Sequence, residues 1–396
     1  MQIGIWWDQD SWGGVDSHML NLLNYWPNET DSFVIFHNLD NKGFHRIKNK
    51  FSKSIKLTSV PFVSKHSEIF LIKVLRNVFF PLVFLLVVLK NYFILRKYKY
   101  LDAIICNNGN YPGSLSCLAT IVSSKLVNIK KRLLLIHHEA QPRRVFISTF
   151  EHLLDNLMQR YSSDIVCVSR ATRKTLIDRR GFFTVRNPIR VIHNGVSLDR
   201  TNSLGNVHLR NDFGIEKEDV VIGMVGRVER YKGHEDLLFA LSDLDSELST
   251  KIKVIIVGSY EEAEKKRLLN IGKVLSVKSE IFFTGYLDVN IQEIIRQFDL
   301  LAMLTKDFEG FGLTIAEAMV VETPVLATCV GGVSEFTDND SINLIPPESP
   351  DSIRLFLEGY FKNRKVILSK VKNAKKNIRN FSADSMSKKF YNLIKV

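Results

Sequence analysis

Short apolar runs alternate with longer segments of helical periodicity along almost the whole chain. This alternation restricts the fold more than any other feature. The first series of runs comprises residues 3–7, 33–36, 103–106, 133–136, 165–168 and 191–192, and the second comprises residues 220–225, 253–257, 281–283, 300–304 and 324–327. Apolar strands that alternate with helices indicate parallel sheets covered by helices on both faces. We therefore predict an α/β fold with two consecutive parallel-sheet domains.

The domain boundary falls where the apolar runs pause. A chain of 396 residues is long enough for two domains. Residues 201–219 are polar and contain no long apolar run, so we expect a linker there between an N-terminal domain (1–200) and a second domain (220–375). The remaining residues, 376–396, have helical spacing and are basic, and we expect them to form a helix that packs back on the N-terminal domain.

The charge is distributed unevenly. Residues 1–200 carry a net charge of +14, residues 201–360 carry −12 and residues 361–396 carry +10. Separate basic and acidic regions indicate two domains with different partners, the basic one facing an anionic partner. The acidic region and the lack of a basic-aromatic motif argue against nucleic-acid binding. The cysteines (Cys106, Cys117, Cys167 and Cys329) lie far apart, and the first residues lack a basic leader, so we expect a cytoplasmic protein without disulfides.

Residues 78–89 form the longest apolar run of the chain. As a helix, twelve residues measure about 18 Å, whereas the hydrocarbon core of a bilayer is about 30 Å thick. A membrane span is therefore not expected. Two interpretations remain open, a buried core helix and a helix that lies in the membrane interface. In the second, the flanking cations would reach the headgroups, and they are Lys73, Arg76, Lys90, Arg96, Lys97 and Lys99.

Two cations follow the first strand of the second series. That strand ends near residue 225, Gly226 allows a tight turn, and Arg227 and Lys232 occupy the loop that opens a helix near His234. Cations beside a helix N-terminus are a common way to bind phosphate. The segment therefore predicts an anion site, although exposed loop cations without a ligand remain the alternative.

A second segment, residues 308–319, follows the strand at 300–304. Gly310 and Gly312 open the backbone, and a helix that begins near Leu313 leaves amide groups free for an anion. Glu309 precedes this helix and Glu317 lies in its first turns. Beside cations, we expect Glu317 to stay ionised and to accept hydrogen bonds from hydroxyl groups.

Together these motifs resemble family 4 of the retaining glycosyltransferases, which have the GT-B fold of two Rossmann-like domains facing across a cleft. The resemblance is most specific in residues 220–335, with Arg-x4-Lys-Gly, the segment Glu-Gly-Phe-Gly-Leu-x3-Glu-Ala-Met, and a later Gly-Gly-Val-x-Glu. Supporting matches are Gly13-Gly14, His137-His138-Glu139, Ser169-Arg170, His-Asn-Gly-Val at 193–196 and Phe-Thr-Gly-Tyr at 283–286.

The resemblance implies a role for each matching residue. Arg227 and Lys232 would neutralise the diphosphate of a nucleotide sugar, and Glu317 would hold the ribose hydroxyls. The other implied donor contacts are Glu309, Gly310, Phe311, Gly312 and Leu313 for the sugar and its phosphates, Gly285 and Tyr286 for the base, Gly13 and Gly14 for the diphosphate or acceptor, and His137 or His138 for the sugar, with a preference for His138.

The implied reaction retains the anomeric configuration, with same-face attack and a donor phosphate oxygen that takes the acceptor proton. The resemblance implies no metal and no cofactor besides the donor substrate. Three Asp-x-Asp patterns, at Asp8/Asp10, 243/245 and 338/340, resemble metal-binding pairs of another fold, and only the first follows a strand. The chain also departs from the family pattern, with Glu322 in place of a common glycine and Lys306-Asp307-Phe308 before the Glu-Gly-Phe-Gly step.

The charge and the apolar run extend this interpretation to the membrane. We expect a peripheral enzyme on the cytoplasmic face that extends a lipid-linked glycan for a surface polysaccharide, with an anionic membrane as a partner. Two alternatives remain, a nucleotide-sugar 2-epimerase of the same fold and a non-catalytic nucleotide-sugar-binding protein associated with the membrane.

Overall fold

The chain forms two compact units in a computed structural model. Unit 1 comprises residues 1–195 and 383–396, and unit 2 comprises residues 196–382. The structure describes residues 1–9, 13–41, 43–44, 46–47, 51, 53, 55–63, 79–183, 188–199 and 207–395. Each unit is described below by itself.

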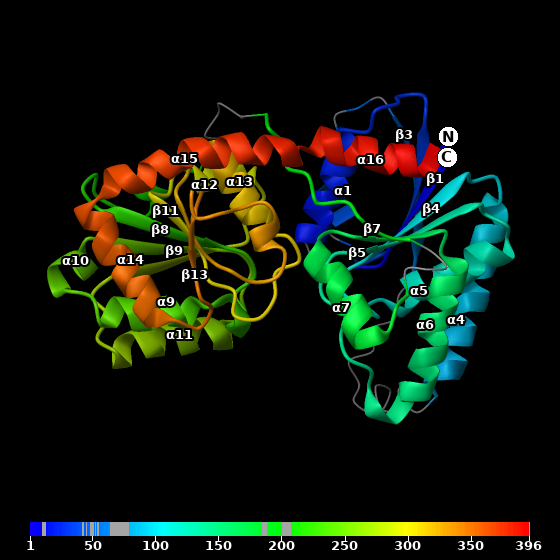
Figure 1. Cartoon of the computed structure of the whole chain (residues 1–396), viewed down its shortest axis with the longest axis horizontal. Coiled ribbons are helices and arrows are strands. Elements are labelled where there is room, and N and C mark those ends of the chain that lie inside the picture. The colour runs from blue at the N-terminus through cyan, green and yellow to red at the C-terminus, as the bar shows by residue number, and fades with distance from the viewer. Residues whose placement is uncertain are drawn as a thin grey trace. The chain divides into compact units, whose positions relative to one another are not determined.

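Unit 1 is built on a seven-stranded sheet in the order β3-β2-β1-β4-β5-β6-β7 (Figure 1). Its strands are β1 (Gln2–Trp7), β2 (Ser32–Asn38), β3 (Lys56–Phe62), β4 (Ala103–Asn108), β5 (Lys131–Ile136), β6 (Asp164–Cys167) and β7 (Ile189–Val191). All the described pairings are parallel. The strands β1, β2, β4, β5 and β6 are largely buried because their residues are mostly apolar on both faces, as parallel strands between two helical layers require. The edge strand β3 is largely exposed.

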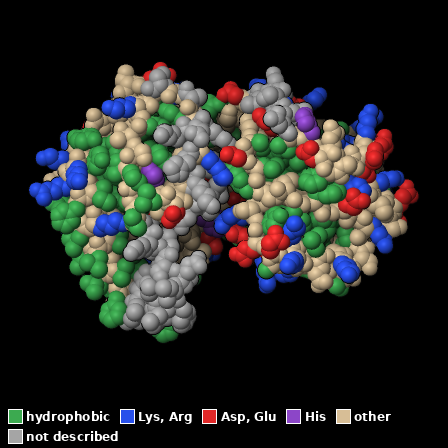
Figure 2. All heavy atoms as spheres, turned by 180° about the vertical axis from the view of Figure 1, so that it is seen from behind, with side chains coloured by type: hydrophobic (Ala, Val, Ile, Leu, Met, Phe, Trp, Pro, Cys, Tyr) green, Lys and Arg blue, Asp and Glu red, His purple; other side chains and the backbone are tan. Residues whose placement is uncertain are grey.

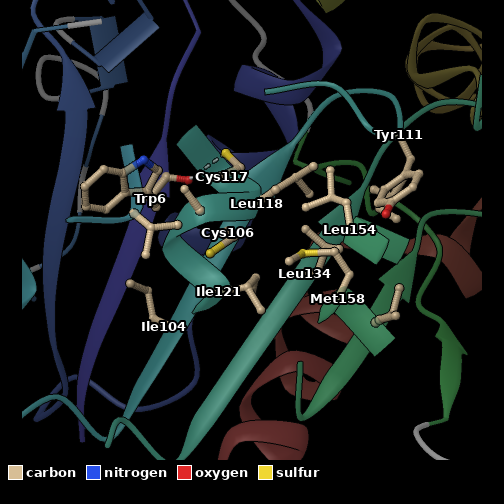
Figure 3. Close-up of a cluster of buried hydrophobic side chains, with 14 of the residues drawn as sticks. Trp6, Ile104, Cys106, Tyr111, Cys117, Leu118, Ile121, Leu134, Leu154 and Met158 are labelled. Atoms are coloured by element: carbon tan, nitrogen blue, oxygen red, sulfur yellow. Dashed lines mark hydrogen bonds between the residues drawn. The ribbon is translucent and has the colours of Figure 1, made fainter. Parts of the chain in front are cut away.

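Helices cover both faces of this sheet. They are α1 (Gly14–Asn24), α4 (Phe80–Leu95), α5 (Leu115–Leu126), α6 (Ser148–Tyr161), α7 (Arg170–Arg180) and α16 (Ala383–Lys395). One core cluster lies between the sheet and the helices α4, α5 and α6, with Trp6, Cys106, Leu118, Leu134 and Met158 buried together (Figure 3). β1 and β4 are neighbours in the sheet, so their carboxyl ends lie side by side. The strand order reverses between these two strands, since β2 and β3 follow on one side of them and β5 to β7 on the other.

Unit 2 contains a six-stranded parallel sheet in the order β10-β9-β8-β11-β12-β13. Its strands are β8 (Val220–Val225), β9 (Ile252–Val257), β10 (Glu280–Gly285), β11 (Leu300–Met303), β12 (Val325–Thr328) and β13 (Asn343–Ile345). Its helices are α8 (Leu209–Asp212), α9 (His234–Ser242), α10 (Ser246–Thr250), α11 (Glu262–Val274), α12 (Ile291–Ile295), α13 (Leu313–Val321), α14 (Pro350–Lys362) and α15 (Arg364–Ile378). The core lies between the sheet and α9, α11 and α14.

The predicted fold class is confirmed, since each unit is a parallel, Rossmann-like sheet with helices. Two strands were missed. The edge strand β3 has Lys56, Thr58, Ser59 and Pro61 in place of an apolar run, and the edge strand β13 is only three residues long. Edge strands need no apolar residues on both faces, so hydrophobicity alone does not identify them.

The division of the chain differs from the expected boundaries. Unit 2 begins at Val196, and the segment predicted as a linker contributes α8, whose Leu209 is buried and whose Arg210 forms an ion pair with Asp299. Residues 201–206 of that segment lie outside the described residues. At the C-terminus, residues 376–382 belong to unit 2, and only the helix that begins at Ala383 belongs to unit 1, where it packs on α1.

Most of the apolar run at 78–89 forms the helix α4, and Val78 lies outside the described residues. One face of α4 is buried in unit 1, and the opposite face is exposed. In the part of the chain that the structure describes, no helix has both the length and the apolar character needed to cross a membrane.

Candidate functional site

In unit 2, the predicted donor-binding residues follow strands whose carboxyl ends meet at one edge. Arg227 follows β8, Tyr286 follows β10 and Glu309 follows β11. β8 and β11 are neighbours in the sheet, and the chain continues from β8 to β9 on one side and from β11 to β12 on the other. Ligands of such sheets bind outside the carboxyl ends of the strands at this reversal of strand order.

The loop after β8 is shaped by two glycines with positive φ. Gly226 has φ +143°, and Gly233 has φ +73° and is followed at once by α9. A Cβ atom at Gly233 would overlap the carbonyl oxygen of Leu304, which follows β11. The Lys232-Gly233 step therefore allows the loop after β8 to lie directly against the segment that leads to Glu309.

Lys232 and Glu309 form an ion pair with 2.9 Å between Nζ and Oε2. Burial disfavours the charged form of Lys232, but attraction to Glu309 outweighs this effect and raises the pKa of the ammonium group. Arg227 is more exposed and pairs with Glu229, with 2.8 Å between Nη1 and Oε1. The site thus holds one charged cation that is partly shielded from water, Lys232, and a second, more exposed cation in the same loop, Arg227.

The N-terminus of α13 leaves amide groups available at the same edge. The helix begins at Leu313, and its N-cap, Gly312, has no side chain to accept their hydrogen bonds. Phe311 is buried and stacks on Phe336 at a centroid distance of 4.4 Å, which anchors the segment. On its other side, a Cβ at Gly331 would overlap the carbonyl oxygen of Glu309. Gly310 to Leu313 are therefore held in a fixed path whose first-turn amides suit an anion.

Glu317 differs from the expectation. Burial raises the pKa of its carboxyl group from 4.5 to about 8, although the side chain keeps some exposed surface. Among the described residues, no hydrogen bond or ion pair reaches this carboxyl group. The expected ionised state is therefore wrong, because burial disfavours the charged form and no described cation pairs with this carboxyl group.

Gly285 and Tyr286 end the neighbouring strand β10. Gly285 has φ +71° and its carbonyl oxygen accepts a hydrogen bond from the Gly258 amide at 3.0 Å. Gly258, at the end of β9, has φ +145° and comes so close to Gly226 that a Cβ atom would overlap it. The ends of β8, β9 and β10 are thereby joined, and Tyr286 lies partly exposed beside them.

Lys306 supplies a connection that the sequence analysis missed. Its Nζ lies 2.9 Å from both Glu235 Oε1 and Asp236 Oδ1, in the first turn of α9. Its backbone amide donates to the carbonyl oxygen of Tyr231 at 2.7 Å. The departure from the family pattern at this position therefore ties the loop that carries Lys232 to the segment that carries Glu309. Only the unusual residue itself could have indicated this, since its partners lie 70 residues away.

In unit 1, Gly13 and Gly14 open α1, the first helix that follows β1. Gly13 is the N-cap of α1, and its amide donates to Asp16 Oδ2 at 2.6 Å. Burial raises the pKa of Asp16 to about 7, although the hydrogen bond from Gly13 opposes this effect. In this unit the glycine pair therefore lies at the start of a helix, at the carboxyl edge of the sheet.

The two histidines after β5 have different environments. His137 is buried, its Nε2 lies 2.7 Å from Asn107 Oδ1, and its ring packs against His18 at 4.7 Å. His138 is only half-buried. Burial holds the pKa of His137 well below its usual value, with His18 adding to the effect. His137 is thus engaged within unit 1, whereas His138 keeps exposed surface.

His18 and Asn194 were not predicted. His18 Nδ1 lies 2.8 Å from Asn194 Oδ1, and His18 is fully buried, with its pKa lowered to about 4 by burial. Asn194 belongs to the His-Asn-Gly-Val segment that supported the resemblance, but no pattern in the sequence indicates its contact with α1.

Of the Asp8/Asp10 pattern, which resembles a metal-binding pair of another fold, Asp10 lies outside the described residues. Asp8 accepts a hydrogen bond from Ser114 at 2.9 Å. Within the described ranges, no group of three or more His, Cys, Asp or Glu side chains is placed to hold a metal ion.

Comparisons with known proteins agree with this arrangement. A family model described as "Glycosyltransferase Family 4" matches residues 12–200, and one described as "Glycosyl transferases group 1" matches residues 208–381. An uncharacterised glycosyltransferase of Methanocaldococcus jannaschii is 25% identical over 252 residues, which cover 62% of this chain and 63% of the relative. The match thus spans less than two thirds of that relative.

Solved structures share the fold over the whole chain. The Anabaena protein HepE, crystallised with UDP and glucose, superposes with a TM-score of 0.77 and 18% identity, covering 100% of this chain and 99% of that one. The lipopolysaccharide outer core galactosyltransferase WaaB superposes with a TM-score of 0.63 and 18% identity, covering 100% and 99%. These neighbours show the GT-B fold, and the two family models, which together match residues 12–200 and 208–381, show that the chain belongs to the family 4, group 1 glycosyltransferases.

Proposed function

We propose that the protein is a retaining glycosyltransferase that moves a sugar from a nucleoside-diphosphate sugar to a lipid-linked glycan. The observation that carries this proposal is the convergence of Arg227, the Lys232–Glu309 pair and the open first turn of α13 at the strand-order reversal of unit 2. Two cations and free helix amides suit a diphosphate, and the family of the chain supports a sugar as its substituent.

Each residue then has a defined task. Breaking the sugar–phosphate bond places negative charge on the leaving diphosphate, which Lys232, Arg227 and the α13 amides stabilise where it develops. Glu317 accepts hydrogen bonds from the ribose hydroxyls, and Gly285 and Tyr286 line the base. When phosphate engages Lys232, the carboxylate of Glu309 is released from its cation and can accept hydrogen bonds from the sugar.

For unit 1 we propose the acceptor role, with Gly13 and Gly14 at the approach and His138 as the contact to the transferred sugar. His138 is preferred to His137, whose ring is engaged with Asn107 and His18. The acceptor attacks the face of the sugar from which the diphosphate departs. Its hydroxyl proton passes to an oxygen of that diphosphate, so the reaction retains the configuration without a protein nucleophile or a metal ion.

We propose that the acceptor is lipid-linked and is extended for a surface polysaccharide at the cytoplasmic face of the membrane. Two observations support this choice, the net charge of the first 200 residues and the similarity to a structure neighbour. The first 200 residues carry a net charge of +14, which an anionic membrane would attract. A structure neighbour, WaaB, is described as a lipopolysaccharide outer core galactosyltransferase. Both observations favour an acceptor held at a membrane over a free sugar.

The test is product analysis. Purified protein is incubated with a panel of UDP- and GDP-sugars, with and without a bacterial lipid extract and with excess EDTA. We expect labelled sugar to enter the lipid fraction for one donor, with EDTA present, and nuclear magnetic resonance of the product to show the donor's anomeric configuration. An inverted product, or loss of activity in EDTA with recovery on Mn²⁺, would refute the mechanism.

The same experiment separates the two alternatives. A 2-epimerase converts the donor to an isomer without any acceptor. A non-catalytic protein binds a nucleoside diphosphate, as seen by a raised melting temperature, but turns over no donor in any mixture.

A further inference from the structure

The inner face of α4 is fixed in place by polar contacts as well as apolar packing. Asn91 is fully buried, and its Nδ2 donates to the Ser116 carbonyl oxygen at 3.1 Å and to Thr120 Oγ1 at 2.9 Å, both on α5. Ser123 Oγ donates to the Val88 carbonyl oxygen at 2.8 Å. Because a buried amide that loses its partners is costly, α4 cannot rotate about its axis to exchange its faces.

The outer face of α4 is apolar as well. Six large hydrophobic side chains on or next to the helix are between 44% and 61% exposed, and they are Phe79, Leu82, Leu85, Leu86, Leu89 and Phe93. A surface helix of a water-soluble protein normally has polar residues on this side, whereas a helix that is apolar all round is normally buried or in contact with lipid. Figure 2 shows hydrophobic side chains gathered along the side of unit 1 where α4 lies.

The apolar surface continues past the start of α4. The rings of Phe80 and Phe84 contact Phe150 at 5.3 and 6.0 Å, which places the beginning of α6 beside them. In the turn just before α6, Val145 and Phe146 are 85% and 101% exposed. We define the α4 surface as the six outer residues of α4 together with Val145 and Phe146.

Cations lie at both ends of the α4 surface. At one end, the guanidinium of Arg144 lies 4.8 Å from the Phe80 ring and is paired with Glu151 at 2.7 Å, whereas Arg96, Lys97 and Lys99 are exposed beyond the other end. From residue 69 to residue 101 the chain contains no Asp or Glu. The surface is therefore apolar along its length and positive beyond the end of α4.

We propose that the α4 surface lies in the interface of an anionic lipid bilayer, with the apolar side chains below the headgroups and the cations among the lipid phosphates. This inference rests on the proposed function, since it names where the enzyme meets the membrane that holds its acceptor. Long cationic side chains beside an apolar helix face are the usual features of an interfacial helix. A second copy of the chain fits less well, because residues 69–101 supply no carboxylate to meet these cations, whereas lipid phosphates would.

The test is vesicle co-sedimentation of the full chain on phosphatidylcholine vesicles with and without 30% phosphatidylglycerol, across a salt series. The variant Leu85→Gln/Leu86→Gln/Leu89→Gln keeps good helix formers at exposed positions. The matched control makes the same substitutions at three exposed apolar positions of unit 2, Leu269, Val274 and Leu355. A second variant, Arg96→Gln/Lys97→Gln/Lys99→Gln, removes cations only.

We expect wild type and the unit 2 control to bind anionic vesicles equally. The leucine variant should bind about 100-fold more weakly. The cation variant should bind anionic vesicles about 100-fold more weakly than wild type at low salt, and nearly as well as wild type at high salt. Equal binding of the leucine variant and wild type would overturn the proposal. Failure of wild type to bind anionic vesicles would also overturn it. Sedimentation velocity would then show whether the α4 surface instead forms a dimer, which the leucine substitutions would dissociate.

The melting-temperature shifts caused by UDP and by GDP are measured on the same preparations. If neither UDP nor GDP causes a shift but vesicle binding behaves as expected, the donor site fails while the α4 surface stands. If UDP stabilises every variant equally and the leucine substitutions leave vesicle binding unchanged, the α4 surface fails while the donor site stands.

Discussion

At the scale of single residues, Lys232 and Arg227 differ in burial and pairing, and this difference predicts unequal effects. Lys232 is mostly shielded from water and held by Glu309, whereas the side chain of Arg227 is about half exposed. A fixed charge in a site that excludes water stabilises a developing negative charge more strongly. We expect Lys232→Ala to lower kcat about 10²–10³-fold and Arg227→Ala to lower it less. Steady-state kinetics checks this, and near-normal turnover in both variants would disprove the phosphate role.

Glu317 predicts a pH dependence of nucleotide binding. Its pKa of about 8 means that the carboxyl group is mostly protonated at neutral pH, whereas a ribose hydroxyl pair calls for the ionised acceptor. UDP affinity should therefore rise as the pH increases towards 8, and binding near pH 7 should release protons. Isothermal titration calorimetry in buffers of different ionisation enthalpy measures this release. Glu317→Gln should remove this part of the pH dependence, and an unchanged proton release would contradict the ribose assignment.

The same pKa has a consequence for stability. A carboxyl group whose pKa is higher in the folded than in the unfolded state favours folding in acid. Its contribution is fully present below about pH 4.5 and is lost as the pH rises towards 8. Glu317→Gln should therefore be more stable than wild type near pH 8 in the absence of ligand, which urea unfolding at several pH values would detect.

At the scale of elements, the end of α13 holds a residue in a conformation that favours glycine. Glu322 has φ +63° at the C-cap, and it pairs with Lys375 of α15 at 2.8 Å. The left-handed conformation costs roughly 1–2 kcal/mol for a residue with a Cβ, whereas a partly exposed ion pair contributes about 0–1 kcal/mol. We expect Glu322→Gly to raise the free energy of unfolding by up to about 1 kcal/mol.

Glu322→Ala is the matched control, because it keeps the Cβ atom and loses the polar contacts of the carboxylate, the ion pair included. Urea unfolding followed by far-ultraviolet circular dichroism should rank the three proteins Gly, Glu, Ala from most to least stable. A glycine variant less stable than wild type would show that the ion pair, and not the backbone, decides at this turn.

The elements also show what a sequence can and cannot predict. Buried strands such as β1 and β8 were predicted because parallel strands need apolar residues on both faces. The edge strand β3 was missed because it is polar and largely exposed. Site residues that directly follow a strand could be predicted, since the topology brings strand ends together. The contact of His18 with Asn194, 176 residues away, could not, because periodicity carries no information about distant partners.

At the scale of the whole molecule, the two ends of the chain belong to the same unit. Helix α16 packs on α1, with the Ser387 hydroxyl donating to the Leu22 carbonyl oxygen and Phe390 fully buried 5.7 Å from the His18 ring. The last 14 residues therefore complete the core of unit 1, after the chain has formed the whole of unit 2. Each unit should respond separately to a substitution in its own core.

This separation predicts that Phe390→Ala destabilises unit 1 alone. Removing a buried phenylalanine costs roughly 3–5 kcal/mol, which corresponds to a urea midpoint about 1–2 M lower. All four tryptophans lie within the first 26 residues, so tryptophan fluorescence follows unit 1 only. The melting-temperature shift caused by UDP follows unit 2. We expect Phe390→Ala to lower the urea midpoint seen by tryptophan fluorescence and to leave the UDP-induced shift in melting temperature intact. The control is Phe183→Ala, at a side chain of unit 1 that is 70% exposed. Its free energy of unfolding should stay within about 0.5 kcal/mol of wild type. An unchanged fluorescence midpoint would mean that α16 does not complete the core of unit 1.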